Sequence, residues 1–490
     1  MMKKLKLLLI ILFFISFPYL GWATNYYIDS AITDTYPASA TPDFTTYNPV
    51  TFETTGGSAS VYKTIADVNL KAFAAGDFVY FRKGQTWYEQ LIIPSSGSAG
   101  NPITFGAYGS GGKPAIDGGF ARNNGINNGS KYYVTIDGLE IKNTITDGIS
   151  VGSWSQYNTI QNCTIHDTRE NGIGIYGTSQ DNIGTIVRDN EIYNFGLLPS
   201  VSGKGQGIMI SGTGVAARVE NALVENNYIH DGGADSHDHG VYEQGYQTTV
   251  RYNNFANITG FGIKVTNDQS GGENGGGNQS YYNIITGCID GGILVESGTS
   301  GPVNNKIWNN VIYNCGATGT KIGGLRYTIG TGTLTGNEFK NNIVLITHGT
   351  PNDCLFVSAN TGTTGLILSN NIYYSANSQL WYHNGNYTGL LSTWQGYAGD
   401  ANSLTSNPLF VSASDFHLQL GSPAINAGVN WGQTRDYNGI NKQGSAWDIG
   451  ALEYFTGKSI ASGDGSQTLT LVGGGKSLSW LKSHERKKHR

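Results

Sequence analysis

The sequence has few charged residues, few prolines and few residues that favour helices. Only 13% of its 490 residues are charged while 38% are hydrophobic, a balance that excludes a disordered chain. With 12 prolines and no three-residue glycine period, a collagen-like triple helix is excluded as well. Glu and Lys are scarce, whereas 70 Gly and 29 Tyr, together with much Thr and Asn, disfavour a helical protein. A large all-β protein with many turns remains.

The start of the chain has the pattern of an export signal. Basic residues at positions 3–6 precede an apolar run over 7–17, and residues 21–23 offer small side chains for cleavage. The run is too short to cross a bilayer, so the pattern predicts a signal peptide over residues 1–23 and a secreted or periplasmic protein without a membrane span. The formal net charge is −5, and an acidic exported chain is not expected to bind nucleic acid.

One short pattern recurs along the middle of the chain. It consists of an apolar residue, two further residues, Asn, one residue and another apolar residue, and Cys163 takes the Asn place in the first copy. Seven steps over 208 residues lead from Cys163 to Asn371, roughly 30 residues each. The copies are centred on Cys163, Asn190, Asn227, Asn253, Asn283, Asn310, Asn342 and Asn371. A second block, Gly followed by alternating apolar residues, starts at Gly148, Gly172, Gly207, Gly240, Gly262, Gly292 and Gly324.

This repeat predicts a parallel β-helix, a single-stranded solenoid in which each coil has three short strands. Asn side chains stacked at the strand spacing of ~4.8 Å can hydrogen-bond along the stack and satisfy the backbone of the turn. A β-propeller would need antiparallel blades of about 40 residues or more. Residues 62–76 have an amphipathic helical pattern before the first coil, and we expect a short N-terminal helix that caps the core.

Both ends of the repeat resemble a known group. Residues 62–118, with AGDFVYFRKGQTW and IPSSGSAGNPITFGAYGSGGKPAIDG, resemble the start of secreted right-handed parallel β-helix proteins of the pectate-lyase-like superfamily. Residues 407–453, with NPLFV, DFHLQLGSPAINAG and DIGALE, resemble its closing segment. The resemblance implies a right-handed helix but leaves the chemistry open, because the superfamily includes lyases, hydrolases, epimerases and adhesins.

We expect one β-helix domain over residues 24–455, acting as a monomer. Its parts are an N-terminal cap with the first coils (24–120), regular coils (121–400) and a closing segment (401–455). Residues 456–490 form a basic, glycine-led tail to which we assign no catalytic role.

The lengths of the coils predict the position of a cleft. The shortest distance from a repeat Asn to the next Gly block is nine residues, but it is seventeen after Asn190, thirteen after Asn227 and fourteen after Asn310. All extra residues therefore enter one corner and form a wall beside the Gly-block strand. In the resembled superfamily the sugar chain lies along this strand.

The residues expected to face outward on that strand carry the candidate chemistry. They are Ser150, Gly174, Met209, Tyr242, Lys264, Leu294 and Arg326 in successive coils, and then Gln244, Thr266 and Glu296 one outward position further on. Tyr242 and Lys264 lie on neighbouring coils, so their backbones should be ~4.8 Å apart with parallel side chains. The loop before Tyr242 holds the densest ionisable cluster of the chain, Asp235, His237, Asp238 and His239.

This group suits β-elimination in a uronate polymer. The reaction needs a positive group beside the substrate carboxylate, a base for the C5 proton and an acid for the leaving oxygen. We predict Lys264 as the base and Tyr242 as the acid, with the reverse also open, and Arg326 or His239 as the neutralising group. Some β-helix alginate lyases are similar in using a Lys/Tyr pair. The predicted function is a secreted lyase for an acidic polysaccharide such as alginate or pectate, with substrate contacts from His237, Asp238, Glu243, Gln244 and Glu296.

Other activities stay open on the same strand. A glycoside hydrolase needs two carboxyls about 5–9 Å apart, for which Asp235, Asp238, Glu243 and Glu296 are candidates. The HG and IK pairs that include His239 and Lys264 faintly resemble the spacing in polygalacturonases, but the aspartate pairs typical of that family are missing upstream. A C5-epimerase would share the proton abstraction, and a non-catalytic adhesin is the third class.

No cofactor is required for this chemistry, although Ca²⁺ could bind. Its ligands would be Asp235, Asp238, Asp268 and Glu273, which match no standard metal signature.

Two cysteines are predicted to lie close together. Cys288 and Cys315 each follow a repeat Asn by five residues, which brings them within disulfide range on adjacent coils. An exported protein can hold such a bond, and two stacked buried thiols are the alternative.

Overall fold

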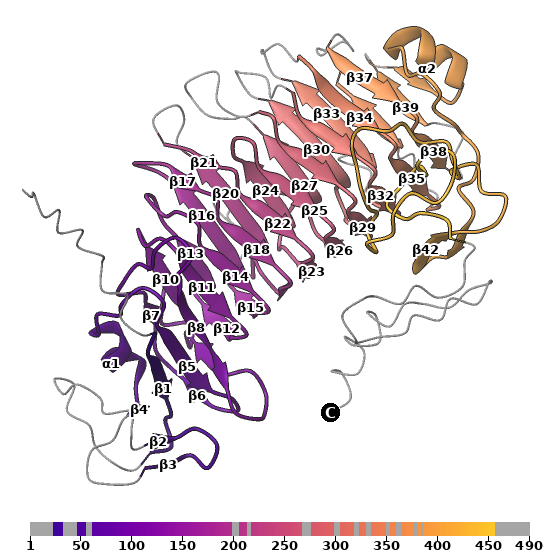
Figure 1. Cartoon of the computed structure of the whole chain (residues 1–490). Coiled ribbons are helices and arrows are strands. Elements are labelled where there is room, and N and C mark those ends of the chain that lie inside the picture. Colours follow the sequence, from indigo (N-terminus) through magenta and orange to yellow (C-terminus); the bar gives the residue numbers. More distant parts are fainter. Residues whose placement is uncertain are drawn as a thin grey trace, which may run out of the picture.

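The chain winds into an elongated solenoid of three long β-sheets (Figure 1). The structure is a computed structural model that describes residues 23–32, 47–54, 61–197, 205–212, 217–266, 276–297, 304–317, 323–329, 335–348, 353–358, 365–375, 380–383 and 386–455. Each coil contributes one strand to each sheet in turn, and the strands within a sheet run parallel except for the last pair of the third sheet. The predicted signal peptide and basic tail lie outside the described residues, apart from the last residue of the former.

The first sheet precedes the Asn corner in each coil. In spatial order its strands are β4 (Val61–Tyr62), β1 (Asn25–Ile28), β5 (Phe78–Arg82), β8 (Ile103–Tyr108), β11 (Val134–Asp137), β14 (Thr159–Gln161), β18 (Ile186–Arg188), β22 (Leu223–Glu225), β25 (Thr249–Arg251), β28 (Gln279–Tyr281), β31 (Lys306–Trp308), β34 (Asn337–Lys340) and β37 (Leu366–Ser369).

The second sheet follows the Asn corner. Its strands are β6 (Thr86–Trp87), β9 (Ala115–Asp117), β12 (Glu140–Thr144), β15 (Thr164–Thr168), β19 (Glu191–Tyr193), β23 (Tyr228–Gly232), β26 (Asn254–Ile258), β29 (Ile284–Thr286), β32 (Val311–Tyr313), β35 (Ile343–Ile346) and β38 (Ile372–Ser375).

The third sheet contains the Gly-block strands. They are β7 (Leu91–Ile92), β10 (Ile126–Gly129), β13 (Ile149–Val151), β16 (Ile173–Gly177), β20 (Ile208–Gly212), β24 (Val241–Gln244), β27 (Phe261–Thr266), β30 (Gly291–Ser297), β33 (Leu325–Ile329), β36 (Leu355–Val357), β39 (Trp381–His383) and β40 (Asn386–Thr388). Three small pairs complete the strands: β2 (Tyr47–Asn48) with β3 (Glu53–Thr54), β17 (Asn182–Ile183) with β21 (Val219–Glu220), and β41 (Phe410–Ser412) with β42 (Asp415–Leu418).

The Asn ladder has the predicted geometry. The side-chain oxygen of Asn253 accepts the backbone N–H of Asn227 at 2.9 Å, while its amide donates to the carbonyl of Val224 and to the side chain of Asn283. The same contacts connect the ladder from the N–H of Cys163 at one end to Ser403 at the other. Because these groups are buried, the ladder satisfies turn backbone that water cannot reach.

A second polar ladder, which the repeat search missed, follows the corner before the first sheet. It begins with the backbone N–H of Thr248 and continues through Asn278, Asn305 and Asn337. The side-chain oxygen of each Asn accepts the backbone N–H of the residue before it in this series at 3.0–3.1 Å. The two ladders fix two of the three corners of these coils.

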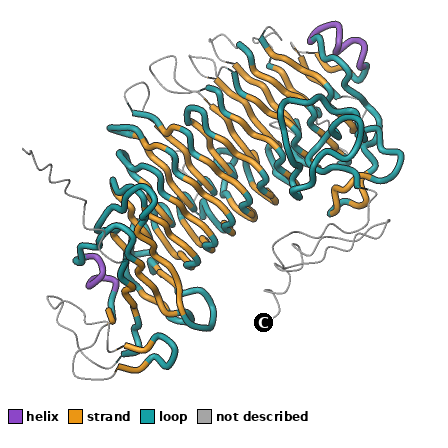
Figure 2. Tube along the Cα trace, viewed as in Figure 1, coloured by secondary structure: helices purple, strands orange, loops and turns teal. Residues whose placement is uncertain are grey.

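The two helices of the described chain lie at opposite ends of the solenoid (Figure 2). The N-terminal helix was expected from the pattern over 62–76 but spans only α1 (Ile65–Asn69), where Thr64 accepts the N–H of Asp67. Phe73, further along the same pattern, is buried outside the helix. At the other end, α2 (Leu391–Ala398) places Trp394 on Trp381 with ring centroids 5.8 Å apart, a cap that the sequence did not indicate.

The closing segment folds back along the outside of the coils instead of extending the stack (Figure 1). Its apolar residues cover aromatic side chains of the corner between the first and second sheets. Trp431 packs on Trp308 with ring centroids 4.4 Å apart, and its indole N–H donates to Asn309. This cluster is separate from the core inside the solenoid.

The cysteines are free thiols. Cys288 and Cys315 lie buried in neighbouring coils, as the repeat predicted, but they form no disulfide. Burial raises the pKa of the Cys288 thiol, and the adjacent Cys315 acts in the same direction. Of the two alternatives, the structure therefore has the pair of stacked thiols. Within the described residues, no helix is long and apolar enough to cross a membrane.

Candidate functional site

The register of the third sheet brings the outward residues of the Gly blocks into one row. Ser150, Gly174, Met209, Tyr242, Lys264, Leu294 and Arg326 pair directly from strand to strand. We call this the outer row. Tyr242 and Lys264 are neighbours, as the coil spacing predicted, and Arg326 follows two strands after Lys264.

Lys264 lies between a carboxylate and an aromatic ring. Its Nζ is 2.7 Å from Glu296 and 5.2 Å from the ring centroid of Tyr242. The lysine side chain is only 13% exposed, whereas the glutamate is 35% exposed. A mostly covered ammonium with one carboxylate partner is a strong local charge, because little water screens it.

Arg326 supplies a second cation on the same face. Its Nε donates to Thr328 at 3.1 Å, and its guanidinium lies 4.8 Å from the ring centroid of Phe356. Burial lowers the pKa of Arg326, while Glu296 and Asp290 act in the opposite direction. The contacts with Thr328 and Phe356 hold the planar guanidinium in one orientation, and this orientation suits a carboxylate ligand.

His239 is buried below the outer row, which corrects its predicted contact with substrate. It is 3% exposed, its Nδ1 accepts the backbone N–H of Phe261, and its ring stacks on Tyr242 at 6.0 Å. Because Nδ1 accepts, a neutral His239 carries its proton on Nε2. The histidine therefore supports the tyrosine ring.

A third polar ladder leads to His239. The side-chain oxygen of Asn171 accepts the N–H of Gln206, and that of Gln206 accepts the N–H of His239 at 2.7 Å. Asp147 begins the series by accepting from the amide of Asn171, and burial raises its pKa to about 6. These residues all stand directly before a Gly block, so this ladder too has a repeat in the sequence.

Gln206 is a positioning residue that sequence reasoning missed. Besides accepting from His239, its amide donates to the carbonyl of His237 at 2.8 Å. One glutamine thus fixes two points of the inserted loop after β23. Asp290, two residues before the Gly block at Gly292, was missed as well; its negative charge acts on Arg326.

The two aspartates of the inserted loop accept hydrogen bonds from the backbone of the same loop. Asp238 was predicted to bind substrate or metal, but it is fully buried and accepts the N–H groups of Ala234 and Asp235. Asp235 accepts the N–H of His237, whose side chain is 67% exposed and lies 3.3 Å from the Asp235 carboxylate. Of this cluster, only His237 presents its side chain mainly to solvent.

Glu243 does not face substrate either. It is fully buried between the inward positions of the neighbouring strands, where Thr248 and Ser280 donate to its carboxyl. Burial raises its pKa to about 7. Gln244 faces outward and accepts from Ser211 at 3.0 Å, whereas Thr266, at an outward position, is buried.

The predicted Ca²⁺ ligands do not converge in the described part of the chain. Asp235 and Asp238 are occupied with backbone amides, and no group of three His, Cys, Asp or Glu able to hold a metal exists among the described residues. Asp268 and Glu273 lie outside the described residues.

Comparison with known proteins agrees with this architecture. Residues 97–222 and 124–324 match the family model described as a right handed beta helix region. The fold is a right-handed parallel β-helix. Its structure resembles that of pectate lyase Pel9A, with a TM-score of 0.52, 17% identity, and coverage of 88% of this chain and 96% of that chain.

Two further solved structures resemble this β-helix protein less closely. They are XylC in complex with xylose (TM-score 0.49, 13% identity, 80% and 96% of the two chains) and an alginate lyase from Paenibacillus sp. str. FPU-7 (TM-score 0.45, 16% identity, 70% and 96%). No curated protein matches the chain. At these identities the likeness concerns the fold.

Proposed function

We propose that the protein is a polysaccharide lyase that cleaves a uronate-containing polymer by β-elimination along the outer row of the third sheet. The observation that carries the proposal is the arrangement of Lys264 beside Tyr242, with Arg326 two strands away. Two covered cations on the sheet face that carries the tyrosine suit a substrate whose negative charge grows during the reaction.

Arg326, Lys264 and Tyr242 each have one role in the proposed reaction. Arg326 binds the uronate carboxylate and stabilises the charge that develops when the C5 proton leaves. Lys264 removes this proton in its neutral form, and the hydroxyl of Tyr242 protonates the leaving oxygen, so that one C–H and one C–O bond break and a C=C bond forms. The reverse assignment uses the same pair, with the ammonium of Lys264 as the acid.

The test is a screen for unsaturated products by ultraviolet absorbance over alginate, pectate, glycosaminoglycans and ulvan-type polymers. We expect absorbance to rise with at least one polymer, and we expect Lys264→Ala and Tyr242→Phe each to lower kcat by about 10²–10⁴-fold. The matched control is Lys340→Ala, since Lys340 forms the same kind of pair with Glu338 on the first sheet at 2.8 Å. Full activity in Lys264→Ala would place the chemistry elsewhere.

A glycoside hydrolase is the second candidate, and it is less well supported because it needs two carboxyls beside the scissile bond. Of its four candidate carboxyls, Asp238 and Glu243 are buried and Asp235 holds the loop, which leaves Glu296 facing outward. New reducing ends without ultraviolet absorbance would favour the hydrolase.

A C5-epimerase would change the uronate composition without cleaving the polymer, and binding without any of these changes would indicate an adhesin.

Further parts of the proposal concern metal, assembly and location. We expect an exported monomer that needs no cofactor, so that activity persists after dialysis against a chelator. Loss of activity that only Ca²⁺ restores would show that a metal takes part. Sequencing the N-terminus of the exported protein tests whether the signal peptide is cleaved. Measuring the mass of the protein in solution tests whether it is a monomer.

A further inference from the structure

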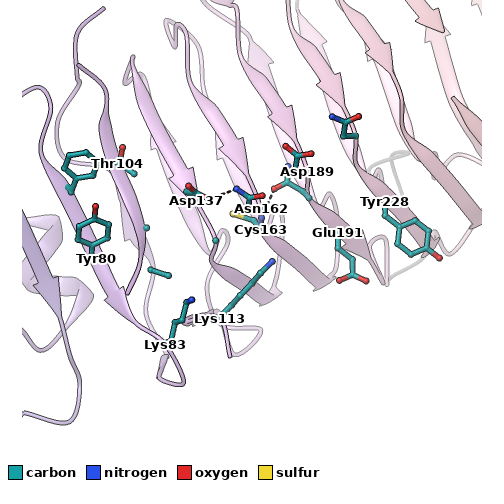
Figure 3. Close-up of a pocket in the computed structure, with 16 residues that line it drawn as sticks. Tyr80, Lys83, Thr104, Lys113, Asp137, Asn162, Cys163, Asp189, Glu191 and Tyr228 are labelled. Carbon is teal, nitrogen blue, oxygen red and sulfur yellow. Dashed lines mark hydrogen bonds between the residues drawn. The ribbon is translucent and has the colours of Figure 1, made fainter. Parts of the chain in front are cut away.

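A hollow of about 590 Å³ lies far from the outer row, on the corner between the first and second sheets (Figure 3). Its lining is aromatic and charged, and includes Tyr80, Lys113, Asp137, Asp189, Glu191 and Tyr228. This corner lies across the coil from the third sheet, so a molecule bound here would not touch Lys264.

The hollow is elongated along the axis of the solenoid. Tyr80 lies at one end and Tyr228 at the other (Figure 3). Tyr80 lies on β5, and Tyr228 lies in the coil that contains β22. In the first sheet these two strands are five strand spacings apart, about 24 Å. A second hollow of about 260 Å³ shares Tyr228 and continues to His417 and Asn438 of the closing segment. We call the two hollows together the corner groove.

The closing segment leaves part of this corner open. Where the segment lies on the coils, the residues at the tip of the corner contact it: Tyr282 packs against Trp431, and the amide of Asn341 donates to the carbonyl of Val429. In the open coils the same position carries Asn162, Asp189 and Asn226, all exposed. The open stretch of the corner is therefore polar by composition and is not an apolar face left without its cover.

The charges of the groove favour an uncharged ligand. In the larger hollow, Lys83 and Lys113 stand against Asp137, Asp189 and Glu191, two positive against three negative charges. The amino group of Lys113 donates to Thr164, and Asp137 accepts from Asn162. Such a nearly balanced lining offers a polyanion no net attraction, whereas carboxylates readily accept hydrogen bonds from hydroxyl groups.

We propose that the corner groove binds an uncharged oligosaccharide or polysaccharide. The rings of Tyr80 and Tyr228 stack on Phe78 at 5.6 Å and on His230 at 4.0 Å, and at the two ends of the larger hollow they can contact sugar rings. The carboxylates between them accept hydrogen bonds from hydroxyl groups, and the amides donate to them. The groove would hold the protein on a neutral polymer while the outer row faces another chain. This inference does not depend on the reaction proposed for the third sheet.

Affinity electrophoresis of the full chain tests the proposal, in separate gels that contain xylan, galactomannan or mixed-linkage β-glucan. At least one polymer should retard the protein, and about 0.5 M NaCl should leave the retardation unchanged because the ligand is neutral. Tyr228→Ala and Asp189→Asn should each weaken binding by about tenfold. Lys264→Ala should bind as the unaltered protein does, and so should the control Tyr132→Ala, whose tyrosine is 46% exposed on another corner.

The proposal is overturned by any of three results. They are no retardation by any of these polymers, retardation that persists in both groove variants, and retardation that Lys264→Ala removes. Asp189 is exposed, so Asp189→Asn keeps the test valid if Tyr228→Ala does not fold. Thermal melts verify that each variant is folded.

Discussion

Lys264 and Glu296 face one another from β27 and β30, and the role of the lysine depends on this ion pair. The carboxylate lies 2.7 Å from the lysine Nζ and holds it against the ring of Tyr242. We expect Glu296→Ala to lower kcat by about tenfold, because the amine is then no longer fixed beside the tyrosine. Glu296→Gln, which keeps a hydrogen-bond acceptor, should recover part of this loss. Unchanged kcat in Glu296→Ala would show that the ion pair does not position the lysine, and Glu338→Ala, at the pair with Lys340 on the first sheet, should leave kcat unchanged.

Glu243 places an ionisable group inside the core and makes stability depend on pH. Burial raises its pKa from 4.5 to about 7, so the folded protein favours the neutral carboxyl. Its contribution to the free energy of unfolding is complete below pH 4.5 and is lost as the pH rises through about 7. The free energy of unfolding changes by about 3 kcal/mol over this range. Glu243→Gln cannot ionise, so denaturant melts from pH 4.5 to 8 should show the variant gaining stability relative to the original protein as pH rises. Equal slopes would contradict a buried neutral carboxyl, and Glu220→Gln, on the surface beside Arg218, serves as the control.

At the scale of elements, the Asn ladder joins strands that would otherwise meet at unsatisfied turns. Asn253→Ala removes the acceptor of the Asn227 N–H and the donor to Val224. Buried polar groups left without partners should cost roughly 2–4 kcal/mol, measured by chemical denaturation. Asn254→Ala, at the adjacent outward position of β26, should cost much less. A similar loss in both variants would mean that the ladder contributes no more than ordinary strand packing.

The repeat determined which elements could be predicted. Periodic Asn and Gly positions predicted the sheets, the ladder and the pairing of Tyr242 with Lys264, because one register applies to every coil. The burial of Glu243 was missed although alternation along β24 turns it inward, since a carboxylate was expected to remain in water. The support of His239 by Gln206 depends on a side-chain hydrogen bond across coils, for which the sequence offered only the shared position before the Gly block.

At the scale of the whole molecule, the closing segment protects the flank of the solenoid. Trp431 joins the segment to Trp308 and Tyr281 of the first sheet, with ring centroids 4.4 and 5.2 Å away, and bonds to Asn309. Trp431→Ala should cost roughly 2–3 kcal/mol and loosen the segment, because that ring is its main aromatic contact with the coils. Limited proteolysis followed by mass spectrometry should then show faster cleavage within residues 401–455 while the coils stay intact. The control Trp154→Ala, whose tryptophan is 59% exposed, should cleave as the original protein does. Cleavage that spreads at once through the coils would instead mean that segment and solenoid unfold as one unit.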